Sequence, residues 1–480
     1  MTVGAGLVTV TVVKLVAGID SSTQSTKVLL VNSGDGSVVA GASAPHPDGT
    51  ECHPDRWWEA LTAAGRDLLA RAEAVGVAAQ QHGMVTLDDT GAVVRPAMLW
   101  NDVKSAPQAA AMVPEFGGPA EWAARTGSVP TMSFTVTKLR WLAEREPEHA
   151  ARVHWVTLPH DWLTWRLAGG GAGHRSIDPV TDRGDASGTG YFSPADSVWL
   201  PDYAARALGH PVALPRVAGP AEVVGHTSWG AAISAGTGDN MGAALGMGLR
   251  GGDVAVSIGT SGTAYAVASA MTADPSGLVS GFADATGRFL PLACTLNAAR
   301  VLDVTARLLG VDSAGLSDLA LKASPGADGL VLLPYLDGER TPNRPAANGV
   351  LRGLTTSNAT PENLARAAVE AVLCSLADAV DCLRPCGITP GRIVLTGGAA
   401  KSEAVRMIAP AVFGLPVVIP EAAEYVALGA ARQAAWALSG TDEPPSWPDR
   451  PSVTHEGSVT PGVREQYGAL RDDAAAWQEP

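Results

Sequence analysis

The chain contains two similar stretches, Gly18-Ile19-Asp20-Ser21-Ser22-Thr23-Gln24-Ser25-Thr26-Lys27 and, much later, Ser257-Ile258-Gly259-Thr260-Ser261-Gly262-Thr263. Each places small hydroxyl-bearing and glycine residues between two apolar runs, which predicts a β-hairpin with a tight turn. Such a turn directs backbone N–H groups and hydroxyls at one point, an arrangement that suits a phosphate group. Two of these hairpins far apart predict a duplicated domain with a nucleotide held between the halves.

The segments after the first hairpin (residues 15–42) continue as alternating helix and strand. A helix is expected at 54–73, followed by buried strands at 75–80 and 97–100. A Trp-rich, mostly helical region follows at 105–167. Residues 168–193 are rich in Gly, Asp, Ser and Thr, which predicts a loop with short strands.

The second half repeats this order. A hairpin at 253–269 precedes a strong helix signal, in which Thr360 is the N-cap and Pro361 the first helical residue. A buried strand is expected at 392–396, and small residues at 427–431 mark a tightly packed helix. Hairpins followed by helices and strands, twice in one chain, predict an α/β fold of duplicated actin-like (ribonuclease H-like) domains with a central cleft.

The domain boundaries follow from composition. Residues 1–14 are expected to be an N-terminal extension, 15–245 the first domain and 246–440 the second, with a tail at 441–480 that packs on the second domain. A run of glycines near the boundary would suit a hinge: Gly242, Gly246, Gly248, Gly251 and Gly252.

The bulk composition of the 480 residues is that of a folded globular protein, with 46% hydrophobic and 17% charged residues. The formal charge of −14 argues against nucleic acid or an anionic membrane as the main partner. The apolar run at 7–19 is interrupted by Lys14 and is too short to span a bilayer, so it is interpreted as a strand.

The cysteines match neither zinc ligands nor a disulfide framework, and buried thiols in a reducing cytoplasm are expected. They are Cys52, Cys294, Cys374, Cys382 and Cys386.

Two aspartates follow expected strands at turns. Asp20 could hold the water shell of a nucleotide-bound Mg²⁺, although an aspartate often caps its own turn. Asp239 follows Gly236-Thr237-Gly238, whose glycines would let a substrate approach closely. It could accept a proton from a substrate hydroxyl, although it could also be a plain helix N-cap.

Polar groups at other strand ends could line a small-molecule site. Gln81 and His82 suit sugar hydroxyls, with a satisfied core histidine as the alternative. Trp100 could supply an aromatic wall and Asp102 a polar contact. Residues 396–402 form a strand–turn–helix pattern with glycines at the turn, where backbone could lie against a base or a phosphate.

In their order these segments resemble the FGGY family of carbohydrate kinases, and within it the members that act on D-xylulose, from about residue 16 to about 435 of this chain. The stretches that carry the resemblance are 18–27, 81–83, 99–102, 158–163, 236–242, 257–262, 333–342, 397–402 and 427–431. The resemblance implies a cytoplasmic enzyme with a sugar-binding first domain and a nucleotide-binding second domain. It would phosphorylate D-xylulose at the 5-hydroxyl with ATP and Mg²⁺.

The resemblance also assigns site residues. Asp239 corresponds to the catalytic base, and Asp20 to the aspartate near the metal and phosphates, which it would hold through water. The substrate contacts would be Gln81, His82, Trp100, Asp102 and Asn240. The ATP contacts would be Thr23, Lys27, Gly259, Thr260, Gly397, Gly398 and Ser402.

Two residues depart from the family pattern. Ser22 stands where the family usually has glycine, and Gln81 where it more often has methionine, which leaves another ketose or a pentitol such as ribulose or xylitol open as substrate. Glycerol is disfavoured, because the Arg-Glu pair of glycerol kinases is absent beside Gln81. When the two turns are aligned with each other, Gly259 stands at the position of Asp20. The second turn would therefore bind phosphate without a carboxylate.

Two other classes of protein are alternatives to the sugar kinase. An actin-like nucleotide switch without sugar chemistry is the main one; a sugar-responsive repressor would need a DNA-binding module, and none precedes the fold. The expected partners are a small-molecule sugar and ATP, not nucleic acid or membrane, with a homodimer left open.

Overall fold

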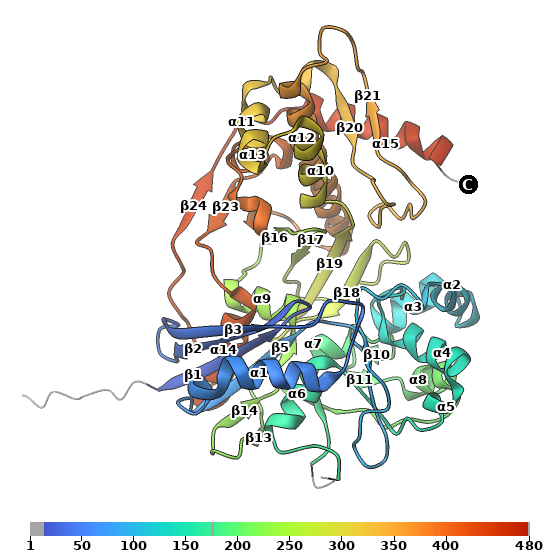
Figure 1. Cartoon of the computed structure of the whole chain (residues 1–480), viewed down its shortest axis with the longest axis vertical. Coiled ribbons are helices and arrows are strands. Elements are labelled where there is room, and N and C mark those ends of the chain that lie inside the picture. Colours follow the sequence, from blue (N-terminus) through green and yellow to red (C-terminus); the bar gives the residue numbers. More distant parts are fainter. Residues whose placement is uncertain (1–13, 174–176, 479–480) are drawn as a thin grey trace, which may run out of the picture.

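The computed structural model describes residues 14–173 and 177–478, with side chains to residue 476. Two seven-stranded sheets dominate these residues, the first in the lower part of Figure 1 and the second in its middle and upper part. The expected N-terminal extension lies outside the described residues except for Lys14.

The two sheets share strand order and strand directions. The first is ordered β13 (Val223–His226), β14 (Ala232–Ser234), β5 (Ala74–Ala79), β1 (Leu15–Ser21), β2 (Ser25–Asn32) and β3 (Val38–Pro45), with β15 (Thr237–Gly238) also paired to β5. The second is ordered β24 (Ser452–His455), β23 (Val417–Pro420), β22 (Arg392–Thr396), β16 (Asp253–Ile258), β17 (Gly262–Ala266), β19 (Phe289–Thr295) and β18 (Val279–Ala283).

In each sheet the central strands are parallel and the flanking strands antiparallel. The parallel pairs are β14–β5–β1 in the first and β23–β22–β16 in the second. The hairpins β1–β2 and β16–β17 are antiparallel, as are the outer pairs β13–β14 and β23–β24. This repeat confirms the duplicated α/β fold predicted from the two hairpins.

The apolar runs predict the buried strands, since a strand covered on both faces is continuously hydrophobic. β5 is buried at every residue and lies one residue from the predicted 75–80. The helix predicted at 54–73 is α1 (Pro54–Leu69), which ends sooner because the chain must turn before β5 begins at Ala74. The strand predicted at 97–100 is only β7 (Ala97–Met98), paired with β4 (Glu51–Cys52).

A helical layer is inserted between β5 and β14, at the right and bottom of Figure 1. Its helices are α2 (Ala106–Glu115), α3 (Pro119–Thr126), α4 (Thr135–Arg145), α5 (Pro147–Ala150), α6 (Pro159–Leu167), α7 (Arg183–Ala186) and α8 (Pro201–Leu208). The short strands among and around them are β6 (Val85–Leu87), β8 (Trp155–Thr157), β9 (Val180–Asp182), β10 (Phe192–Ser193), β11 (Val198–Trp199) and β12 (Arg216–Ala218).

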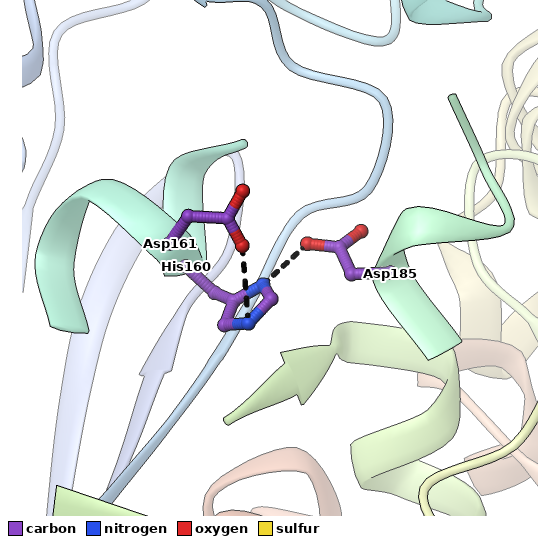
Figure 2. A group of neighbouring side chains, drawn as sticks. All are labelled: His160, Asp161 and Asp185. Atoms are coloured by element: carbon purple, nitrogen blue, oxygen red, sulfur yellow. Dashed lines mark hydrogen bonds and ion pairs between the residues drawn. The ribbon is translucent and has the colours of Figure 1, made fainter. Parts of the chain in front are cut away.

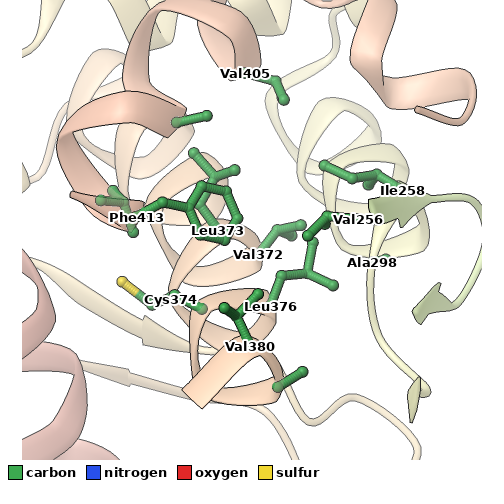
Figure 3. Close-up of a cluster of buried hydrophobic side chains, with 14 of the residues drawn as sticks. Val256, Ile258, Ala298, Val372, Leu373, Cys374, Leu376, Val380, Val405 and Phe413 are labelled. Carbon is green, nitrogen blue, oxygen red and sulfur yellow. The ribbon is translucent and has the colours of Figure 1, made fainter. Parts of the chain in front are cut away.

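The second half is built around α12 (Pro361–Leu383). The Thr360 hydroxyl accepts a hydrogen bond from the Asn363 N–H at 3.2 Å, which confirms the predicted N-cap. Figure 3 shows Val372, Leu376 and other side chains of α12 packed against Val256 and Ile258 of β16. The surrounding elements are α10 (Ala299–Leu309), α11 (Ser313–Lys322), α13 (Glu403–Phe413), β20 (Val331–Leu333) and β21 (Val350–Arg352).

Two helices, α9 (Asp239–Met247) at the end of the first half and α14 (Tyr425–Ser439) late in the second, cross with their backbones in contact. A Cβ atom on Gly246 would lie 2.0 Å from the Tyr425 carbonyl oxygen, and one on Gly429 would lie 1.8 Å from the Gly242 carbonyl oxygen. Glycine is required at such an approach. Gly242 and Gly246, expected to form a hinge, therefore serve close helix packing.

Each crossing helix also contacts the other half of the molecule. Ala427 and Ala431 of α14 share a core with Val16 and Ala74 of the first sheet. Met241 and Leu245 of α9 share a core with Ala255 and Val394 of the second sheet. The two sheets are thereby held on opposite sides of one helix pair.

The segment after α14 contacts both halves. The Trp447 indole N–H donates to the Ser33 carbonyl in the β2–β3 turn at 3.0 Å. The chain then adds β24 to the second sheet, and Val463 and Tyr467 of α15 (Pro461–Gln478) join the core around α12.

The five cysteines are free thiols; Cys52 and Cys374 are buried, whereas Cys294, Cys382 and Cys386 are half-buried. Among the described helices, none combines the length and the apolar character needed to cross a bilayer.

Candidate active site

The first predicted turn presents a buried carboxylate. Asp20 lies near the carboxyl end of β1 and is 2% exposed, and burial raises the pKa of Asp20 to about 6 against the lowering effects of Ser22 and Lys27. The Ser22 hydroxyl donates to Asp20 Oδ1. Ser22 does not adopt a left-handed backbone, so serine causes no strain where the family usually has glycine.

Lys27 is opposite Asp20 in the β1–β2 ladder. Its Nζ lies 3.8 Å from Asp20 Oδ2 and 2.6 Å from Glu424 Oε2 at the start of α14. This ammonium therefore connects the first turn to the second half of the chain.

Trp100 and Asp102 differ in their surroundings. The Trp100 indole N–H donates to Thr23 Oγ1 at 2.8 Å, so the ring lies beside the first turn. Asp102 is buried and accepts from the Thr50 hydroxyl at 3.0 Å and from the Lys104 N–H at 2.9 Å. The Asp102 carboxylate therefore joins Thr50, which precedes β4, to Lys104, and its contact with substrate stays a prediction.

Gln81 and His82 follow β5 at the carboxyl edge of the first sheet. Gln81 Oε1 accepts from Asn240 Nδ2 at 2.9 Å, whereas the buried Gln81 Nε2 has no partner. His82 has a left-handed backbone, with φ of 65°. Its Nδ1 lies 2.6 Å from the Gly188 carbonyl, so Nδ1 carries the proton and Nε2 is left as an acceptor.

The strained backbone of His82 is held by residues of α4. The buried Lys138 Nζ donates to the His82 carbonyl at 2.7 Å, and the Thr135 hydroxyl lies 3.3 Å from the same oxygen. Burial lowers the pKa of Lys138 to about 7. Burial also lowers the pKa of His82 to about 3, so the imidazole is neutral at physiological pH.

Asp239 and Asn240 begin α9 and come next to Gln81 through sheet pairing. β15 runs parallel to β5 with Gly238 opposite Ala79, so Asp239 emerges beside the end of β5. Burial, together with the charges of Asp20 and Asp185, raises the pKa of Asp239 to about 7. A carboxyl group that titrates near neutral pH is suited to act as a general base.

The second predicted turn offers backbone but no carboxylate. The Gly259 carbonyl accepts from the Ala299 N–H at 2.9 Å, at the start of α10, and the Thr260 side chain is exposed. The last ladder pair of this hairpin is Ile258 with Gly262, so Gly259 lies in the turn, whereas Asp20 lies within its strand.

The glycines after β22 have different surroundings. Gly397 has φ of 91°, and a Cβ there would lie 2.6 Å from the Ile258 carbonyl oxygen, whereas nothing lies within 4 Å of a Cβ on Gly398. Gly398 begins a short 3₁₀ turn instead of the predicted helix, and Ser402 is the N-cap of α13, its hydroxyl 3.5 Å from the Val405 N–H.

Sequence reasoning missed several residues of this region. Lys138 and Asp185 lie in the inserted layer, Glu424 begins α14, and Arg340 contributes its charge to the lowered pKa of His82. Tyr265 of β17 is buried and feels the charge of Asp239. A lysine among apolar helix positions was a signal for Lys138; the others have no local signal, because their neighbours come from distant segments.

Residues 15–246 match the FGGY family of carbohydrate kinases, N-terminal domain, and residues 254–438 match its C-terminal domain. The chain is 48% identical to a xylulose kinase of Streptomyces coelicolor and 47% identical to one of Streptomyces rubiginosus, over 89% of each chain in both cases. The crystal structure of xylulose kinase from Bifidobacterium adolescentis is similar with a TM-score of 0.90 and 44% identity, covering 96% of this chain and 99% of that one.

Proposed function

This chain belongs to the FGGY family of carbohydrate kinases, and on that premise we propose that it phosphorylates D-xylulose at the 5-hydroxyl with ATP. The products would be D-xylulose 5-phosphate and ADP, which places the enzyme in xylose metabolism. The observation that carries the proposal is Asp239, a carboxyl group with a pKa of about 7 that is raised in part by Asp20 and that precedes Asn240, the partner of Gln81.

The family membership sets aside the nucleotide switch without sugar chemistry, because the chain is a sugar kinase with an alcohol group as acceptor. We also propose that it works in the cytoplasm, where ATP and reduced thiols are found together.

As a carbohydrate kinase the chain uses ATP with a divalent metal, which we propose to be Mg²⁺. The structure fits both: Asp20 is a buried carboxylate near the single ammonium of Lys27, and the space above Gly398 is open. Asp20 would hold the metal through water. The nucleotide would contact Thr23, Lys27, Gly259, Thr260, Gly397, Gly398 and Ser402. When bound, Mg²⁺ neutralises negative charge on the phosphates.

The residues around Asp239 can orient a polyhydroxylated substrate. The free Gln81 Nε2 donates a hydrogen bond and His82 Nε2 accepts one, so a carbonyl or hydroxyl oxygen and a hydroxyl hydrogen are both recognised. Asn240 holds Gln81 and donates to Asp239 Oδ1 at 3.0 Å from its side chain. Asp239 would accept the proton of the hydroxyl as its oxygen attacks the γ-phosphoryl group.

The substrate is tested by measuring ADP release with D-xylulose, D-ribulose, L-ribulose, xylitol and glycerol. The highest kcat/KM is expected for D-xylulose. A higher value for another ketose or a pentitol would overturn the sugar and leave the family intact.

The base is tested with Asp239→Asn, which preserves size and removes the proton acceptor. We expect kcat to fall by about 10²- to 10⁴-fold with ATP affinity retained. Turnover close to that of the wild type would remove Asp239 from this role.

A further inference from the structure

A buried cluster of one imidazole and three carboxylates lies behind the turn that carries Asp239. His160 and Asp161 are in the first turn of α6, Asp182 ends β9 and Asp185 lies in α7. Their side chains are between 0% and 4% exposed. Neither substrate contact nor the proton transfer described above uses them.

The carboxylates surround the imidazole on both nitrogens. His160 Nδ1 lies 2.6 Å from Asp185 Oδ2, and Nε2 lies 3.3 Å from Asp161 Oδ1, as Figure 2 shows. Asp182 Oδ1 is 3.9 Å from Nε2. Burial opposes a charge on His160, but Asp161 and Asp185 outweigh it and raise the pKa of the imidazole. Burial also raises the pKa of Asp161 to about 7 and that of Asp185 to about 6, so His160 is the group of the cluster that holds a proton most strongly.

The cluster contacts the turn between β14 and α9 at two consecutive residues. A Cβ on Gly236, where φ is 77°, would lie 2.6 Å from His160 Cδ2, so the backbone lies directly against the ring. The Thr237 hydroxyl donates to Asp182 Oδ2 at 2.9 Å. Asp239 follows two residues later, and its position therefore depends on these contacts.

Asp182 also holds Asp185, the second carboxylate whose charge raises the pKa of Asp239. Its Oδ1 accepts from the Asp185 N–H at 2.8 Å and its Oδ2 from the Gly184 N–H at 2.9 Å, which holds α7 against the same turn. Asp185 is in turn bonded to His160 and adds its charge to the field at Asp239.

We propose that His160, as an imidazolium held by Asp161, Asp182 and Asp185, is a positioning residue for Asp239. It supports the Gly236–Thr237 turn and keeps Asp185 ionised beside the base. This inference rests on the proposed function, because it takes Asp239 as the base of the kinase reaction.

Other titratable groups bear on the pH dependence of these two side chains. The groups facing His160 are Asp161, Asp182 and Asp185, and Tyr191 faces two of these carboxylates. Those facing Asp239 are Asp20, beside Lys27, together with Asp185 and Tyr265.

The test compares His160→Gln and Asp185→Asn with the wild type in kcat, KM for both substrates and the pH profile of kcat/KM. We expect kcat to fall about 10- to 100-fold with KM unchanged, as for a displaced catalytic group. The acid limb should move to lower pH in both variants. Asp185→Asn removes a negative charge directly, and without the imidazolium Asp185 itself binds a proton.

A purely structural role would lower thermal stability or raise KM for both substrates and leave the acid limb in place; either result with an unmoved limb would overturn the inference. Should His160→Gln not fold, Gly236→Ala tests whether the turn must lie against the ring, because its Cβ would displace the turn from His160 and from the Val77 carbonyl of β5. Its control is Gly209→Ala, which has a similar left-handed backbone but open space around its Cβ. Loss of kcat is expected only for Gly236→Ala, and equal kcat in the two would overturn the inference.

Failure of the proposed function gives a different result. If wild-type enzyme phosphorylates no sugar, or if Asp239→Asn keeps the wild-type acid limb, the general base is wrong. If the wild type phosphorylates D-xylulose and Asp239→Asn loses the acid limb, the proposed function stands. If His160→Gln and Asp185→Asn then match the wild type, only the positioning role is wrong.

Discussion

The two hairpins β1–β2 and β16–β17 occupy equivalent places in two sheets of the same topology, but they supply different chemistry. The first contains Asp20, a buried carboxylate bonded to Ser22 and near Lys27. Counted from the last ladder pair, its counterpart in the second hairpin is Ser257; matched turn on turn, it is Gly259. Either comparison leaves the second hairpin without a carboxylate.

The two sheets therefore repeat the same backbone topology, whereas the side chains that follow their strands differ. At the first sheet, Gln81 and His82 follow β5, and Asp239 follows β15. At the second sheet, Gly397 and Gly398 follow β22, and open space borders Gly398. We therefore expect changes in the first half to alter turnover and changes in the second half to alter stability or nucleotide binding.

The strongest test of this division is Asp20→Asn. If Asp20 holds the metal through water, kcat should fall by about 10- to 100-fold, and the Mg²⁺ concentration needed for half-maximal activity should rise. Steady-state kinetics over a magnesium series measures both. An unchanged magnesium dependence would show that the two hairpins do not differ in this way.

The pH profile of kcat/KM should depend only on titratable groups of the first half of the chain. Asp239 must be ionised to accept a proton, so activity should fall about tenfold per unit as pH drops below about 7. In Asp20→Asn the midpoint should move to lower pH, because a neighbouring negative charge that raises the pKa of Asp239 is gone. An unchanged midpoint would show that the charge of Asp20 does not affect the pKa of Asp239.

In the second half, Gly397→Ala should act on stability. A side chain at φ of 91° is strained, and its Cβ would overlap the Ile258 carbonyl, so a loss of about 1–3 kcal/mol is expected in denaturant unfolding. Gly398→Ala is the matched control, since its Cβ meets open space. Equal stability of the two variants would contradict this reading of the turn.

The smallest effect is expected for Thr260→Ala. The exposed hydroxyl would contribute one hydrogen bond to phosphate, so KM for ATP should rise about 2- to 10-fold while kcat stays near the wild-type value. A fall in kcat as large as that of Asp20→Asn would show that the second hairpin takes part in the chemical step.

Much of the fold was predictable because its signals are local. The hairpins, β22 and the N-cap of α12 lie where the patterns indicated, since turns, caps and apolar runs depend on residues a few positions apart. The end of α1 and the length of β7 were predicted less well, because they depend on where the next strand must begin.

The sequence indicated individual candidate residues of the site, but not how their side chains contact one another. Asp20, Gln81, His82 and Asp239 were singled out by their places at or after the ends of strands, and their roles stay predictions. Asp102 contacts Thr50 and Lys104, and its contact with substrate also stays a prediction. Gly242 and Gly246, predicted to suit a hinge, allow α9 and α14 to touch, and the hinge itself stays a prediction.

The sequence by itself determined the two hairpins, the duplicated order of elements and the positions of the chemical groups, because each depends on nearest neighbours along the chain. Only the tertiary structure decided their protonation and surroundings. Lys138 reaches the His82 carbonyl, Glu424 reaches Lys27 and His160 reaches Asp185 through the packing of separate elements. Burial and charge act through space, so a pKa near 7 at Asp239 arises only when those elements meet.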